Sequence, residues 1–269
     1  MDKIINIIKG MVIGVSNIIP GVSGGTMAVV LGIYDKIISS ATGFFKDWKK
    51  NAFFLGQLAI GAAIGILAFS KVITFLFESY PKQTNLFFIG LILGSAPLIF
   101  KKATESKVNK ANYIWFLVAF IALAVMGVMS EPASAKEVIG NLTLGTGISL
   151  LLSGFIAAAT MILPGVSGSL VLMMIGMYNP ILNAVSEFNI PVLMLVGIGV
   201  LLGFATMAKI IEMLFNKYPQ TAYFTILGLI LGSVFGIYQG FGTGMVMIGA
   251  IIAFIIGFGI SYILGKKES

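Results

Sequence analysis

The chain has 269 residues, of which 58% are hydrophobic and 10% are charged, and its net charge is +7 at neutral pH. It contains no cysteine and no histidine, which excludes disulfides, thiolate nucleophiles, imidazole bases and metal sites built on these ligands. We therefore expect no metal and no other cofactor. All 17 cations are lysines, and most stand in short segments beside apolar runs. This pattern is typical of a membrane protein and gives no reason to expect nucleic-acid binding.

Apolar runs that are long enough to cross a bilayer recur along the chain and predict an all-α polytopic membrane protein with a single membrane domain, 1–269. No cleavable signal peptide is recognisable at its start. Transmembrane helices are expected at 52–77, 84–100, 112–129, 190–215, 221–238 and 245–264.

Two further pairs of apolar runs are each joined by a Pro-Gly break: 4–19 with 25–38, and 145–163 with 169–186. As a helix, the run 25–38 would reach only about 21 Å, which is less than the roughly 30 Å of a hydrocarbon core. Each pair is therefore predicted to form a re-entrant helical hairpin that enters and leaves on one side.

The two halves of the sequence repeat one another. The segment "PGVSGGT" begins at Pro20 and "PGVSGS" begins at Pro164, while 65–95 aligns without a gap with 203–233. One hairpin plus three spans makes each half cross the membrane an odd number of times. The halves, 1–130 and 142–265, are therefore expected to be inverted relative to each other.

The lysines predict the orientation. With the N-terminus inside, the cytoplasmic side receives thirteen of them: Lys3, Lys9, Lys36, Lys46, Lys49, Lys50, Lys101, Lys102, Lys107, Lys110, Lys217, Lys266 and Lys267. The outer side receives two, Lys82 and Lys136, and the spans contain Lys71 and Lys209. By the positive-inside rule, both termini are expected in the cytoplasm.

The hairpin tips are the candidate binding site. A proline followed by a glycine ends a helix and leaves backbone groups without intrahelical partners, so each tip must face protein or a polar cavity. Small and hydroxyl residues follow each break, where free N–H groups favour an anion such as phosphate. The candidate ligands are Ser23, Gly24, Gly25, Thr26, Ser167, Gly168 and Ser169. Helix capping and close helix packing are the alternative roles of these residues.

Charged and aromatic residues near the spans supply further candidates. Lys71 and Lys209 occupy matching positions and are expected either to offer counter-charge to a phosphate or to extend to the nearest interface. Glu78 and Glu212 are candidates for coupling to a proton or sodium ion. Tyr34, which follows the first break, is either an interfacial anchor or a ligand contact.

The paired "PGVSGGT…GIY" and "LPGVSGS…GMY" motifs, each followed by a "YP…GLILGS" segment, resemble those of the DUF368 family, the polyprenyl-phosphate transporters of bacteria. The resemblance covers essentially the whole chain, and its matching positions are 20–26 and 164–169. It implies flipping of undecaprenyl phosphate from the outer to the cytoplasmic leaflet of the bacterial cytoplasmic membrane, so that the carrier is reused in cell-envelope synthesis. Many members carry an acidic residue where this chain has Asn17.

Two other functions stay open at this point. A transporter of a small anion could use the same hairpin tips. A membrane-embedded enzyme acting on polyprenyl phosphate would need a nucleophile with a base or a metal cluster, and the chain has few residues for either. The expected partners are the phosphate lipid and the surrounding membrane lipids, and the sequence carries no prediction of oligomeric state.

Overall fold

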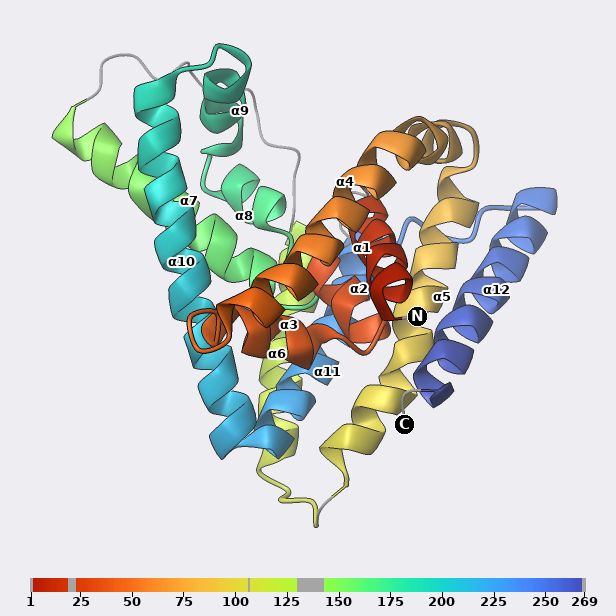
Figure 1. Ribbon diagram of the computed structural model, residues 1–269. Helices are drawn as coiled ribbons and strands as arrows, with labels where there is room; N and C mark the ends of the chain where they lie inside the picture. The colour runs from red at the N-terminus through yellow and green to blue at the C-terminus, as the bar shows by residue number, and fades with distance from the viewer. Residues whose placement is uncertain (1, 19–22, 106, 130–142, 268–269) are drawn as a thin grey trace.

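A computed structural model describes residues 2–18, 23–105, 107–129 and 143–267 (Figure 1). Within these ranges the regular secondary structure consists of α-helices. Their bounds are α1 (Asp2–Ile18), α2 (Gly24–Val30), α3 (Tyr34–Thr42), α4 (Trp48–Ser79), α5 (Pro81–Ala103), α6 (Asn112–Met129), α7 (Leu144–Ile162), α8 (Gly168–Met174), α9 (Tyr178–Ser186), α10 (Ile190–Lys217), α11 (Pro219–Ile237) and α12 (Met245–Lys267).

Six of these helices are long and apolar enough to cross a membrane: α4, α5, α7, α10, α11 and α12. Helix α6 is also apolar but shorter. The expected spans therefore have counterparts in the fold, with two differences. The span expected over 112–129 corresponds to α6, which is not among the six helices that are long enough. Helix α7 was expected to be one arm of a re-entrant hairpin, yet at 19 residues it is long enough to span by itself. The chain is an all-helical, multi-pass membrane protein.

The expectation of single helices over 25–38 and 169–186 is wrong. The first run is split into α2 and α3, and the second into α8 and α9. Each split falls at a glycine with positive φ, Gly32 at 66° and Gly176 at 73°. Only glycine adopts this left-handed conformation without steric cost, so these two matching positions end their helices.

Glycine faces bring the long helices together. A side-chain carbon on Gly61 of α4 would overlap the backbone oxygen of Ile7 in α1, and one on Gly199 of α10 would overlap that of Leu151 in α7. These two contacts join positions that correspond in the sequence repeat. Close backbone approach of this kind is how helices associate in lipid, where burial of apolar surface supplies little driving force.

The last helix of each half packs against the other half. Gly90 of α5 meets the backbone of Phe254 in α12, and Gly228 of α11 meets that of Phe116 in α6. Gly90 and Gly228 hold the same place in the two Gly-Leu-Ile-Leu-Gly-Ser runs. Helix α6 of the first sequence half thus packs on α11 of the second, and α12 of the second packs on α5 of the first.

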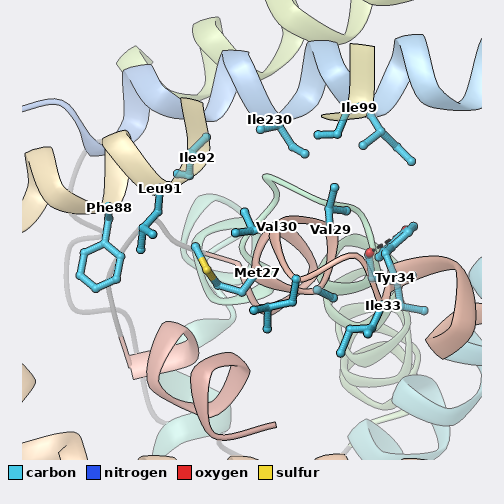
Figure 2. Packing of buried hydrophobic residues seen from close by; sticks show 14 of the residues in the cluster. Met27, Val29, Val30, Ile33, Tyr34, Phe88, Leu91, Ile92, Ile99 and Ile230 are labelled. Atoms are coloured by element: carbon cyan, nitrogen blue, oxygen red, sulfur yellow. Dashed lines mark hydrogen bonds between the residues drawn. The ribbon is translucent and has the colours of Figure 1, made fainter. Parts of the chain in front are cut away.

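Helices α2 and α3 lie in the middle of the molecule, whereas α8 and α9 lie beside α7 and α10 toward one end (Figure 1). Figure 2 shows Met27 and Val30 of α2 facing Ile92 of α5 and Ile230 of α11. These four side chains are at most 3% exposed. The short helix that follows the first Pro-Gly break is thus part of the hydrophobic core.

Candidate functional site

The two hairpin tips line one groove, although their sequences lie far apart. A groove of about 410 Å³ takes Gly24 and Gly25 from the first tip and Gly168 and Ser169 from the second. Its other walls come from α1, α3, α7 and α10 and are almost entirely apolar. The groove is open to the surface of the protein, because some of its lining residues are exposed, among them Asn17 and Ser169.

Polar groups of the protein itself already hold the first tip. The Gly24 N–H donates to Asn17 Oδ1 at 3.2 Å, and the Gly25 N–H donates to Ser23 Oγ at 3.1 Å. Thr26 Oγ1 accepts a 2.6 Å hydrogen bond from the N–H of Gly165, which joins the first tip to the second. Ser23 and Thr26 are 4% and 1% exposed. These two hydroxyls therefore act inside the protein and do not reach the groove.

The second tip is more open. Ser169 is exposed and Ser167 is half-buried, and their hydroxyls lie 2.9 Å apart. The side chain of Ser167 makes no cap hydrogen bond to α8. Of the predicted hydroxyl residues, Ser169 is the one that lines the groove, and Ser167 lies next to it.

The glycines at the tips pack against protein atoms. A side-chain carbon on Gly24 would lie 2.7 Å from Asn17 Oδ1, and one on Gly168 would lie 2.7 Å from the backbone oxygen of Ala157. Gly168 therefore has a packing reason to be small, whereas at Gly24 the neighbouring atom is the end of the Asn17 side chain, which also accepts the hydrogen bond of the Gly24 N–H. A bulkier residue at either position would disturb the tip itself, so such a change does not isolate a contact with a ligand.

The predicted charged residues lie away from the tips. Lys71 and Lys209 are exposed on α4 and α10, and neither lines the groove. Glu78 is exposed and Glu212 is half-buried. The structure thus does not gather these four side chains around the tips. Of the site positions matched by sequence, 20–22 lie outside the described residues.

Several polar residues near the first hairpin were missed as site candidates. Lys102 was expected only to mark the cytoplasmic side, yet its Nζ lies 3.4 Å from Asp35 Oδ2. The hydroxyl of Tyr223 donates to the same oxygen at 2.8 Å. Lys9, also counted as a topology marker, donates to the carbonyl of Leu31 at the end of α2 at 2.8 Å. One feature of the sequence could have pointed to these residues: the acidic Asp35 directly follows the "GIY" motif.

Tyr34 is a buried structural contact and not an interfacial anchor. It is 5% exposed, and its hydroxyl donates to the carbonyl of Ile162 in α7 at 3.0 Å. It therefore ties the first hairpin to the second at the floor of the groove, close to Gly25.

A larger apolar groove lies on another side of the first hairpin. It has a volume of about 820 Å³ and lies between α1, α2, α4, α5 and α12. Ser16, Tyr80, Gln83 and Thr84 are the polar residues in an otherwise aliphatic and aromatic lining. Within the described residues, no three Asp or Glu side chains come together in a way that could hold a metal ion.

Comparison with known proteins agrees with the resemblance in the motifs. The model of the VCA0040-like family, described as undecaprenyl phosphate translocase-like, matches residues 13–255. A polyprenyl-phosphate transporter of Staphylococcus aureus is 34% identical over 275 residues, covering 98% of this chain and 96% of the relative. A polyprenyl-phosphate transporter of Vibrio cholerae is 31% identical over 248 residues, covering 87% of this chain and 77% of the relative. No solved structure matches significantly. The chain belongs to the VCA0040-like family of undecaprenyl phosphate translocase-like proteins.

Proposed function

We propose that this protein moves undecaprenyl phosphate across the bilayer, with the phosphate headgroup held in the groove between the two hairpin tips. The observation that carries the proposal is the meeting of both tips in one apolar groove that is open to the protein surface. Ser169, which lines the groove, would donate to the phosphate oxygens with the adjacent hydroxyl of Ser167 beside it, while the aliphatic walls suit the first isoprene units. The rest of the chain would stay in lipid, so a lateral path is sufficient.

The shape of the groove favours a lipid over a small anion. A site for a soluble ion needs a water-filled approach lined by polar groups. The groove has mostly apolar walls, and exposed apolar residues such as Met161 and Phe204 line it. An amphiphile that enters from the membrane fits these walls better. The names of the family and of the relatives are those of transporters, and they do not suggest an enzyme.

We further propose that the halves are inverted repeats with re-entrant hairpins, that both termini are cytoplasmic, and that the protein resides in the bacterial cytoplasmic membrane. The matched contacts of Gly61 and Gly199, and of Gly90 and Gly228, support the repeat. The lysine-bearing residues 107–111, the turn between α10 and α11, and the end of α12 all lie in the lower half of Figure 1. Placing that side in the cytoplasm puts the lysines of these three segments inside, as the positive-inside rule expects.

Inward transport of the lipid should be coupled to an ion gradient. A phosphate monoester carries about −1.5 to −2 charges at neutral pH, and one charge crossing 100 mV changes the free energy by about 2.3 kcal/mol. Uncompensated movement of this anion toward a negative interior is therefore uphill. A co-transported proton or sodium ion would offset this cost, and Glu78 and Glu212 remain the candidates for binding it.

The test is headgroup translocation in liposomes that contain purified protein and undecaprenyl phosphate, followed with a membrane-impermeant phosphate probe. We expect faster loss of outer headgroups than in protein-free liposomes, with the mass of the lipid unchanged. Imposed pH, sodium and voltage gradients should change the rate or the end point. Equal rates with and without protein would contradict the transport function, and indifference to all three gradients would contradict only the coupling.

A further inference from the structure

A second polar cluster lies where α3, α5 and α11 meet, apart from the serines of the tips. Two donors converge there on one carboxylate oxygen: Lys102 Nζ at 3.4 Å and the hydroxyl of Tyr223 at 2.8 Å from Asp35 Oδ2. The Lys102 ammonium also lies 5.5 Å from the centre of the Tyr223 ring, within the range of a cation–π contact. Lysine and tyrosine therefore form a preassembled pair of donors.

The carboxylate in this cluster is exchangeable. The side chains of Lys102 and Asp35 are 30% and 44% exposed, and ion pairs of this exposure contribute little net free energy because water screens them. The 3.4 Å separation is also longer than the 2.7–2.9 Å or so of a strong charged hydrogen bond. An anion that binds both donors more strongly can therefore displace Asp35, provided that it also replaces the 2.8 Å hydrogen bond from the Tyr223 hydroxyl.

Tyr34 connects this cluster to the groove at the tips. A small cavity of about 20 Å³, large enough for about one water molecule, is lined by Tyr34, Asp35, Lys102 and Tyr223. Tyr34 also lines the groove at the tips. Tyr34 thus borders both sites, and its hydrogen bond to Ile162 holds its side chain in place.

We propose that Lys102 and Tyr223 form a second anion site, suited to a phosphate monoester, which the Asp35 carboxylate occupies as an exchangeable internal anion. The ammonium and the phenol donate to two phosphate oxygens, and Asp35 moves out to water. The identification of the monoester as a lipid headgroup rests on the proposed function, whereas free phosphate would offer the same oxygens. A headgroup that leaves the tips past Tyr34 would reach this site next.

Binding of geranyl phosphate to the purified protein in detergent tests the site. Asp35→Asn removes the internal anion and should bind geranyl phosphate about two- to fivefold tighter than wild type, the range set by a weak, partly exposed ion pair. Adding Lys102→Gln should abolish this gain and weaken binding roughly tenfold, because a charged hydrogen bond is lost. Adding Lys101→Gln, on the exposed neighbour, should preserve the gain. Tyr223→Phe should reduce the gain while keeping the ring.

The result that overturns the site is the absence of any gain in Asp35→Asn, or a gain that persists with Lys102→Gln. Geraniol serves as the apolar control, and an equal gain for geraniol also overturns it. Binding of inorganic phosphate distinguishes a free phosphate ion from a lipid headgroup as the natural ligand. If Asp35→Asn raises the affinity for inorganic phosphate as much as that for geranyl phosphate, the site is assigned to the free ion. If it raises the affinity for geranyl phosphate more, the site is assigned to the lipid. Matching melting temperatures verify that each variant is folded.

Translocation in liposomes separates this proposal from the proposed function. If wild-type protein does not move undecaprenyl phosphate, the transport function fails while the binding result still tests the site. If wild type transports, and Lys102→Gln and Tyr223→Phe transport at the rate of Lys101→Gln, the second site has no part in the path and the inference fails alone.

Discussion

The bond between the two hairpin tips gives a stability prediction. Thr26 Oγ1 accepts the N–H of Gly165 at 2.6 Å, and Thr26 is 1% exposed. Thr26→Val keeps the shape of the side chain and removes the acceptor, which leaves a buried N–H unsatisfied. The cost of such a group is about 1–3 kcal/mol. We therefore expect Thr26→Val to lower the free energy of unfolding by that amount.

The expected shift can be measured by thermal unfolding in detergent, with tryptophan fluorescence as the signal. For domains of 150–250 residues, 1 kcal/mol moves the Tm by about 2–4 °C, so the variant should melt roughly 2–12 °C lower. Thr26→Ser keeps the acceptor and loses one methyl group, a loss of about 0.8 kcal/mol. It should therefore lie between wild type and the valine variant.

The matched control is Thr225→Val in α11. Thr225 is half-buried, and its hydroxyl donates to the carbonyl of Thr221 within the same helix. Losing this bond leaves no backbone donor unsatisfied, so a change of no more than about 0.5 kcal/mol is expected. Because Thr26 does not reach the groove, binding of geranyl phosphate per folded molecule should be unchanged by Thr26→Val. Equal melting temperatures for Thr26→Val and Thr225→Val would refute the reasoning.

Three further outcomes follow from the same contacts. Ser169→Ala should weaken phosphate-lipid binding several-fold without a change in Tm, and unchanged binding would remove the second tip from the site. Lys71→Gln and Lys209→Gln should each reduce transport if these lysines supply counter-charge, whereas wild-type rates would leave them as interfacial residues. Gly203→Ala should destabilise the protein by about 1–3 kcal/mol, because its new methyl group would overlap the backbone of Phe155. The control is Gly197→Ala in the same helix, which meets nothing within 4 Å and should be neutral or stabilising; equal stability of the two alanine variants would contradict the packing argument.

The sequence by itself determined the class of protein, the positions of the long helices and the interruptions that follow α1 and α7. These features follow from demands that act along the chain. A span must be apolar over a fixed length, and a proline with a glycine interrupts it wherever it stands. The repeat was also visible, because corresponding glycines such as Gly90 and Gly228 are kept at matching positions. Gly32 and Gly176 are also visible in the sequence, but a glycine inside an apolar run does not show whether its φ is positive, so the ends of α2 and α8 were not predicted.

Only the tertiary structure decided which parts of the two halves meet. The packing of α6 on α11 and of α12 on α5 follows from how glycine faces fit in three dimensions, and a one-dimensional pattern does not name their partners. The same holds for the two tips, which both line one groove although the hydroxyls of the first, Ser23 and Thr26, are buried and Ser169 of the second is exposed. Asp35 and Tyr223 are 188 positions apart in the sequence, yet they form a hydrogen bond. The positive-inside rule predicts the side of the membrane on which Lys102 lies, but it does not predict that Lys102 pairs with Asp35. Composition and periodicity record how each segment meets lipid, whereas a polar site depends on which segments the packing brings together.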